Sequence, residues 1–152
     1  MATKLQDENR KSRALKTYVK LMRAAESITS RVHKHLSSAG LTVSQFGVLE
    51  AIYHLGPLSQ KDLGRKILRS SGNITMVIDN LEKRRLVRRE RDTSDRRIFI
   101  VHLTGQGQKL IRKIFPSHAA LITGELSVLN ATDQMKLGNL CKKVGMGVNT
   151  RN

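Results

Sequence analysis

A chain of 152 residues, with 28 Lys and Arg against 12 Asp and Glu and a formal charge of +16, is expected to form one domain and to bind a polyanion. Only 3% of its residues are aromatic, too few for the stacking surfaces of single-strand binders, so the composition favours duplex DNA. No apolar run approaches the ~18 residues of a membrane span, and the first residues lack the apolar segment of a secretory signal.

Cysteine usage indicates a reducing compartment. Cys141 is the only cysteine, which excludes an internal disulfide, so we expect a cytoplasmic protein. A lone cysteine on a helix is more often a small buried apolar side chain than a redox switch, and we expect this of Cys141.

Two helices are predicted in the first third of the chain. Apolar residues recur every three or four positions from Ala14 to about Ser37, which predicts a long amphipathic helix, and the polar residues before it are expected to be frayed. Gly40 is a typical residue to end this helix. In LTVSQF, Thr42 and Gln45 have the spacing of a capping box, which predicts a second helix to about Leu55.

Two more helices are predicted in the middle of the chain. In LSQKDL, Ser59 takes the capping position and Asp62 follows three residues later, so a short helix should end near Ile67. Ser70 or Ser71 is expected to cap the next helix, which runs to about Arg84. One stripe of this helix is apolar and consists of Ile74, Val77, Ile78 and Leu81.

The hydrophobic period then changes. LVRRER and IFIVHL predict two strands, and DTSDRR predicts the turn between them. Thr104 is placed to cap a further helix, which Pro116 is expected to kink or break. A last helix is predicted from about Ala131. The fold class is therefore mainly α with a small β-hairpin.

This order of elements is that of a winged helix-turn-helix, with the hairpin as the wing. We expect one domain, 1–152, whose DNA-binding core covers 41–103. The helices in 12–39 and 104–147 are too apolar for so small a core to cover, so we expect them to form a dimerisation region.

The second helix of the helix-turn-helix has the pattern of a DNA-reading helix. Its apolar back would dock on the domain, and its front of small or polar groups would let the backbone enter a major groove ~12 Å wide. The segment from Lys83 to Arg97 also contains eight Lys or Arg, which favours DNA contact over an ordinary solvated face. The candidate contacts are Ser70, Ser71, Asn73, Thr75, Met76, Lys83, Arg96 and Arg97.

Asp95 and Arg97 lie two residues apart in a segment that we interpret as extended, so their side chains should project to the same side. The carboxylate of Asp95 could then position the guanidinium of Arg97, and Arg is the side chain favoured in narrow minor grooves. A surface ion pair that contributes little is the alternative.

The segment DTSDRRIFIVHLT, from Asp92 to Thr104, resembles the wing of the MarR family of bacterial and archaeal transcriptional regulators. LTVSQFGVLEAI, LSQKDLGRKI and SSGNITMVIDNLEKRRLV resemble the second, third and recognition helices of that family, and the match covers about Leu15 to Leu140. The resemblance implies a homodimer with interleaved terminal helices, a recognition helix in each major groove and Arg97 in the flanking minor groove.

Many members of this family are repressors that small aromatic acids or other anionic ligands release from DNA. The resemblance therefore implies an effector cavity where the first, second and fifth helices meet, and the candidate lining residues are Tyr18, Met22, His33 and Tyr53. A closed apolar core at this junction is the alternative. The chain lacks the first-helix cysteine of the peroxide-sensing members, and its five histidines include no i, i+4 pair, so no metal site is expected.

The favoured function is a ligand-responsive transcriptional regulator, most simply a repressor, that binds a pseudo-palindromic operator as a homodimer. The alternative is an architectural winged-helix protein that binds DNA with little sequence preference and has no effector. An enzyme is not expected, and no cofactor is expected either, because the sequence has no phosphate loop and no pairing of a nucleophile with a base.

Overall fold

The computed structural model describes residues 2–67 and 71–147 and, within them, the side chains of residues 5–67 and 73–146. The chain divides into two compact units, Met1–His118 and Ala119–Asn152. The unit boundary falls within the fifth helix, and the first unit contains all the strands.

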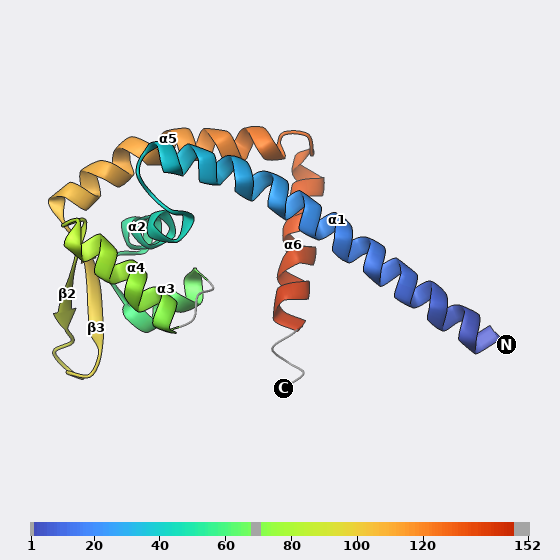
Figure 1. Ribbon diagram of the computed structural model, residues 1–152, viewed down its shortest axis with the longest axis horizontal. Coiled ribbons are helices and arrows are strands. Elements are labelled where there is room, and N and C mark those ends of the chain that lie inside the picture. Colours follow the sequence, from blue (N-terminus) through green and yellow to red (C-terminus); the bar gives the residue numbers. More distant parts are fainter. Residues whose placement is uncertain (1, 68–70, 148–152) are drawn as a thin grey trace. The chain divides into compact units, whose positions relative to one another are not determined.

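The described residues form six helices and a small antiparallel sheet (Figure 1). In chain order the elements are α1 (Ala2–Ser38), α2 (Val43–Leu55), β1 (Leu58–Ser59), α3 (Gln60–Lys66), α4 (Ser71–Lys83), β2 (Val87–Arg91), β3 (Phe99–Leu103), α5 (Gly105–Leu126) and α6 (Ala131–Gly147). The predicted class, mainly α with a hairpin wing, is confirmed.

Side-chain caps set the starts of α2 and α3, as the sequence predicts. The backbone N–H of Gln45 donates to the Thr42 hydroxyl at 3.1 Å, and the Thr42 N–H donates to the Gln45 side-chain oxygen at 3.1 Å. At α3, the N–H of Asp62 donates to the Ser59 hydroxyl at 3.1 Å. These bonds satisfy N–H groups that have no partner inside the helix.

α1 ends as expected but begins earlier. Gly40 has a φ of +72°, and the N–H of Leu41 donates to the Leu36 carbonyl at 3.0 Å, which closes the helix. The expectation of a frayed segment before Ala14 is wrong, because α1 already begins at Ala2. This segment contains Lys, Arg, Gln, Glu and Leu with no Gly or Pro, and these strong helix formers extend the helix despite their polarity.

Pro116 does not break α5, which is continuous from Gly105 to Leu126. Proline removes one N–H donor, so the carbonyl of Arg112 loses its helical partner. Arg112 is exposed, and its carbonyl can be hydrated instead. The hydroxyl of Ser117 also donates to the Ile114 carbonyl at 2.9 Å, within the same turn.

The sheet has the strand order β1-β3-β2. The hairpin strands were predicted, and their register places Arg89 opposite Val101. The third strand, β1, was not predicted, because two residues are too few to show an alternating pattern. It pairs Leu58 with Val101 and joins the start of α3 to the hairpin.

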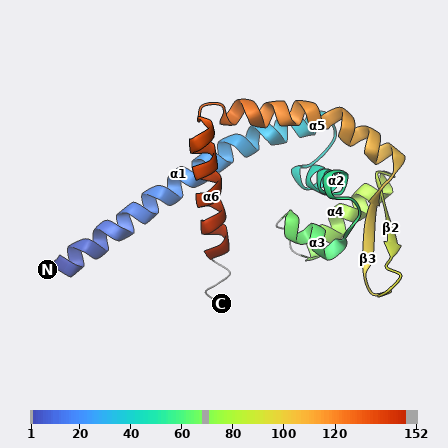
Figure 2. The ribbon, with the colours of Figure 1, turned by 180° about the vertical axis from the view of Figure 1, so that it is seen from behind.

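The core of the first unit lies between the helices and the hairpin. α2, α3 and α4 gather on one side of β2 and β3 in both views (Figures 1 and 2). Ile74, Ile78 and Leu81 of α4 are at most 2% exposed, so this helix packs through the predicted stripe, although Val77 is only half-buried. The opposite face of α4, which carries Met76 and Lys83, is thereby turned away from the core.

The start of α6 agrees with the prediction, whereas the exposure of Cys141 does not. α6 begins near Ala131 as predicted, and Asn130 caps it by accepting from the N–H of Asp133 at 2.9 Å. Cys141, expected to be buried, is exposed. The apolar residues near it on α6, Leu140 and Val144, are exposed as well, so the apolar character of this helix does not by itself bury its side chains.

Gly107, in the first turn of α5, packs closely against the backbone of Leu86, and this packing can be tested by mutation. The Thr104 hydroxyl accepts from the Gly107 N–H at 3.1 Å, and a Cβ at position 107 would clash with the backbone carbonyl of Leu86. Gly107→Ala should therefore lower the free energy of unfolding by at least ~1–3 kcal/mol, measured by urea denaturation. Gly105→Ala is the matched control, since nothing lies within 4 Å of a Cβ there. Equal stability of the two variants would contradict this packing.

Candidate DNA-binding surface

A hydrogen bond joins the two helices of the helix-turn-helix. The side-chain amide of Gln60, the first residue of α3, donates to the hydroxyl of Thr75 in α4 at 2.7 Å, and Thr75 is half-buried. Thr75, a candidate DNA contact, thus also holds α4 against α3. Gln60 was not singled out in the sequence, because its partner lies 15 residues away.

The remaining candidate DNA contacts of the helix-turn-helix differ in exposure and in whether the structure describes them. Asn73, Met76 and Lys83 are exposed, and Met76 and Lys83 lie on the face opposite the buried stripe, with Met76 61% exposed. An exposed methionine at this place offers an apolar group for a thymine methyl. Ser70 lies outside the described residues; Ser71 begins α4, but its side chain is not described.

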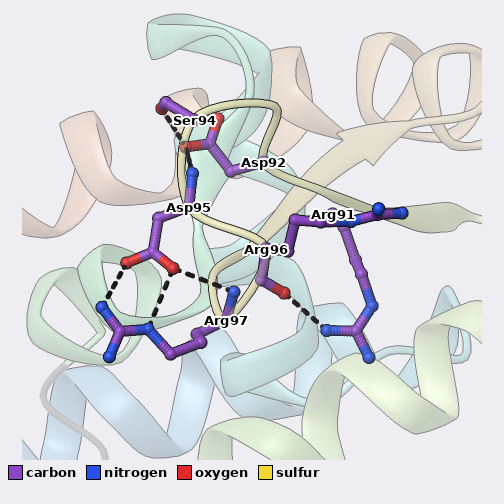
Figure 3. A network of polar contacts seen from close by, with 6 residues as sticks. All are labelled: Arg91, Asp92, Ser94, Asp95, Arg96 and Arg97. Carbon is purple, nitrogen blue, oxygen red and sulfur yellow. Dashed lines mark hydrogen bonds and ion pairs between the residues drawn. The ribbon is translucent and has the colours of Figure 1, made fainter.

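The wing tip is a closed turn rather than an extended loop (Figure 3). Main-chain bonds of 2.9 Å run from the Asp92 N–H to the Ile98 carbonyl and from the Ile98 N–H to the Asp95 carbonyl. The Asp92 carboxylate accepts from the Ser94 hydroxyl at 2.6 Å and from the Asp95 N–H at 3.2 Å. The turn from Asp92 to Ile98 is therefore held by its own local hydrogen bonds.

Within this turn, Asp95 holds Arg97 with two parallel bonds (Figure 3). Arg97 Nε and Nη2 donate to the two carboxylate oxygens at 3.0 and 3.1 Å, and the Arg97 N–H donates to Oδ1 at 3.0 Å. The side chain of Arg97 is 91% exposed, so the positioned guanidinium faces solvent. The prediction that both side chains lie together is confirmed. The reason given for it is wrong, because a turn and not an extended segment brings them together.

The protonation of these groups follows from their hydrogen bonds. The side chain and then the backbone N–H of Arg97 hold the pKa of Asp95 below its ordinary value, and Asp95 in turn raises the pKa of Arg97. The Ser94 hydroxyl lowers the pKa of Asp92. Both carboxylates are therefore charged at neutral pH, and the tip keeps its geometry there.

Two further arginines of the wing differ from Arg97. Arg91 lies with its guanidinium 4.6 Å from the centre of the Phe99 ring and donates to the carbonyl of Arg96. Arg96 itself is exposed, as a phosphate contact requires. Arg91 was not predicted as a site residue, although the cross-strand register that pairs it with Phe99 is the signal that would have found it.

The four candidate effector contacts do not come together within one chain. Tyr18 and His33 are 15 residues apart on one continuous helix, about 22 Å at 1.5 Å per residue. Tyr18, Met22 and His33 are exposed. Tyr53 is half-buried, with its ring centre 6.3 Å from that of Phe115 in α5. Only Tyr53 therefore lies at the α2–α5 junction.

A second group of rings lies where α1, α2 and α5 meet. The Phe46 and His118 rings are 4.2 Å apart between centres, and His35 and His118 are 6.1 Å apart. His35 Nε2 and His118 Nδ1 are buried and have no hydrogen-bond partner within the described part of the chain. Burial lowers the pKa of His118, against the opposing charge of Glu50, so this imidazole is neutral at neutral pH.

Within 2–67 and 71–147, no group of three or more His, Cys, Asp or Glu side chains could hold a metal ion. In the same residues no helix has both the length and the apolar character needed to cross a membrane.

The chain has the features of a winged helix-turn-helix DNA-binding protein. These are the joined helices α3 and α4, the solvent-facing side of α4 and the wing arginine, Arg97, held by Asp95. Comparison with known proteins gives the family. Residues 41–99 match the model of the MarR family. The transcriptional regulator MhqR of Bacillus subtilis is 38% identical over 134 residues, which cover 88% of this chain and 92% of MhqR. The chain belongs to the MarR family of transcriptional regulators.

Solved structures agree with this fold. Sco3205, a MarR family regulator from Streptomyces coelicolor solved in complex with DNA, superposes with a TM-score of 0.83 at 22% identity, covering 90% of this chain and 88% of Sco3205. BpsR of Bordetella bronchiseptica, whose DNA binding is regulated by 6-hydroxynicotinic acid, has a TM-score of 0.76 at 25% identity, covering 86% and 98%. An architectural DNA-binding protein, the alternative left open by the sequence, is not favoured.

The pair of Asp95 and Arg97 predicts an unusual sign for one substitution. Arg97→Ala should weaken DNA binding roughly five- to 150-fold per contact and lower the salt slope by about one per ionic contact. Asp95→Ala should also weaken binding, although it removes a negative charge that faces phosphates. Both affinities would be measured on a duplex selected from a random-sequence library. Tighter binding by Asp95→Ala would mean that the wing is only a basic patch.

The same pair should tolerate a wide range of pH. The pKa of Asp95 is depressed in the fold, so its contact with Arg97 is present above the ordinary carboxyl pKa and is lost only as the pH falls through the lower folded value. The contribution of Arg97 to DNA binding should therefore be constant between about pH 5 and pH 8.

Proposed function

We propose that this regulator acts in the cytoplasm as a homodimeric repressor, binds a pseudo-palindromic operator and is released by a small anionic aromatic effector. An operator that overlaps a promoter would be closed to polymerase while the dimer is bound. In this proposal, α4 contacts bases in the major groove and Arg97 enters the minor groove. We assign it no catalytic activity.

The exposed terminal helices carry the proposal of a dimer. Every side chain from residue 5 to residue 27 is exposed, yet one stripe of α1 is apolar. Its large side chains are 42–66% exposed and comprise Leu15, Tyr18, Val19 and Met22. On α6, Met135, Leu140 and Val144 are likewise 61–65% exposed. Apolar stripes of this extent on long helices favour burial against a second copy of the chain.

A two-fold dimer also fixes the form of the operator. Two copies of α4 would enter successive major grooves on one side of the duplex, so the half-sites should lie about 10 bp apart. The exposed candidates Asn73, Met76 and Lys83 would contact each half-site, together with Ser70, Ser71 and Thr75.

The effector proposal rests on the junction of α1, α2 and α5. His35 and His118 each have a buried ring nitrogen with no hydrogen-bond partner among the described residues, and the ring of His118 lies beside that of Phe46. Such nitrogens can exchange hydrogen bonds with the hydroxyl or carboxylate of an aromatic acid, and the ring of Phe46 can stack on it. The regulation of BpsR by 6-hydroxynicotinic acid supports this class of ligand. Of the four candidates from the sequence, Tyr53 adjoins this junction through its contact with Phe115.

Dimerisation can be tested without disturbing the core. Leu15→Gln/Met22→Gln removes two exposed apolar side chains from each chain, so it should leave folding intact and raise the dimer dissociation constant at least about a hundredfold. Lys16→Gln/Lys20→Gln, on another face of the same exposed helix, is the matched control. Sedimentation velocity measures both. A double variant that stays as dimeric as the control would rule out this face as the interface.

The effector site can be tested by titration of hydroxylated benzoic and nicotinic acids against the DNA complex. We expect such an acid to weaken DNA binding, and His118→Phe to abolish that response while DNA affinity without the acid stays unchanged. An acid that releases wild-type and His118→Phe protein equally would place the effector elsewhere.

A further inference from the structure

Arg89 lies where the wing passes the recognition helix. Its guanidinium Nη2 is 2.6 Å from an Asp79 carboxylate oxygen and 2.7 Å from Glu82 Oε2, and its Nε is 3.1 Å from the same Glu82 oxygen. Both carboxylates belong to α4, whereas Arg89 belongs to β2. One side chain thus bridges two elements with three short polar contacts.

The main chain adds a fourth contact at the same place. The N–H of Arg89 donates to Glu82 Oε1 at 3.1 Å, so Glu82 holds the backbone of β2 and the tip of the side chain at once. The Phe99 ring, 5.9 Å from the guanidinium carbon, lies on the β3 side of this contact. The position of β2 along α4 is fixed by these bonds.

Exposure separates Arg89 from the arginines that can reach DNA. The side chain of Arg89 is 23% exposed, compared with 91% for Arg97. The Nε and Nη2 donors of Arg89 are directed at two carboxylates of its own domain, and the guanidinium cannot extend to a phosphate without leaving both. The positive charge of Arg89 is therefore compensated by carboxylates of the same domain.

We propose that Arg89 is a positioning residue for DNA binding: it fixes the wing relative to the recognition helix and neutralises Asp79 and Glu82, and it does not contact DNA. The reason for the first role is geometric. α4 and Arg97 read different grooves of one duplex, so an error in their relative position costs one contact or the other.

The second role is electrostatic. Asp79 lies on the reading side of α4, next in sequence to the exposed Asn80, and Glu82 follows within one turn. Without Arg89, two uncompensated carboxylates would stand close to the phosphates that the surrounding cations attract. Their repulsion would oppose binding of any sequence.

The test compares Arg89→Gln with Arg88→Gln. Both remove one positive charge from β2, but Arg88 is half-exposed and pairs with Glu90 on the same strand. On a duplex selected from a random-sequence library, we expect Arg89→Gln to weaken binding at least about a hundredfold and Arg88→Gln less than about tenfold. Equal losses would mean that Arg89 is one phosphate contact among others, and the proposal would fall.

Coupling to Arg97 distinguishes positioning from charge. If Arg89 places the wing, Arg97→Ala should cost much less affinity in the Arg89→Gln background than in the wild type. Additive losses would overturn the positioning role. This step rests on the proposed contact of Arg97, and a wild-type background insensitive to Arg97→Ala would show that contact to be wrong while leaving the comparison with Arg88 valid.

Arg89→Lys guards against a variant that fails to fold. Lysine keeps the charge but is a point donor that cannot form the same fork with both carboxylates. Urea denaturation would confirm that it is folded, and its DNA affinity should stay well below the wild type. Full affinity in Arg89→Lys would show that only the charge matters and would overturn the proposal.

Discussion

The shortage of carboxylates is the constraint on which the DNA-binding surface depends. The chain has 28 Lys and Arg but only 12 Asp and Glu, so there are too few carboxylates to pair with each basic side chain. The few carboxylates near α4 and the wing therefore decide which guanidinium groups are held and in which direction. Asp79 and Glu82 keep Arg89 on the domain, while Asp95 presents Arg97 to solvent. Acidic groups on a DNA-binding face thus serve to orient cations, and their negative charge is offset where they do so.

The distinction between Arg89 and Arg97 could not be made from the sequence, because both are arginines in one basic hairpin. What separates them is the range of their contacts. Asp95 is two residues from Arg97, and a pattern that short is visible in the sequence. Asp79 is ten positions from Arg89 across an element boundary, so their contact depends on how β2 packs along α4.

The same rule accounts for the rest of what was predicted. Helix starts at Thr42 and Ser59 follow from hydrogen bonds spanning three residues, and the structure contains them. The bond between Gln60 and Thr75 and the close approach of Gly107 to Leu86 join distant segments, and no local pattern marks them. α1 was underestimated for a different reason: polarity was taken as a sign of fraying, whereas backbone propensity decided the outcome. The sequence correctly predicted an apolar stripe on the terminal helices. These side chains are exposed in the single chain, and the proposed dimer would cover them.

α4 is anchored along its whole length, and this limits how the reading surface can change. Gln60 holds Thr75 in its first half, Arg89 holds Asp79 and Glu82 in its second, and Arg84, just beyond its end, donates to the Gly40 carbonyl at 2.7 Å. A tilt of α4 within the chain would break at least one of these contacts, and the wing would have to follow through Arg89. In the proposed DNA complex, base reading by α4 and minor-groove reading by Arg97 would therefore be set together within each chain. In the proposed dimer, the variable left for an effector is the separation of the two reading surfaces, which the terminal helices control. Because the proposed half-sites would have to match that separation, an effector would not need to touch α4 in order to release DNA.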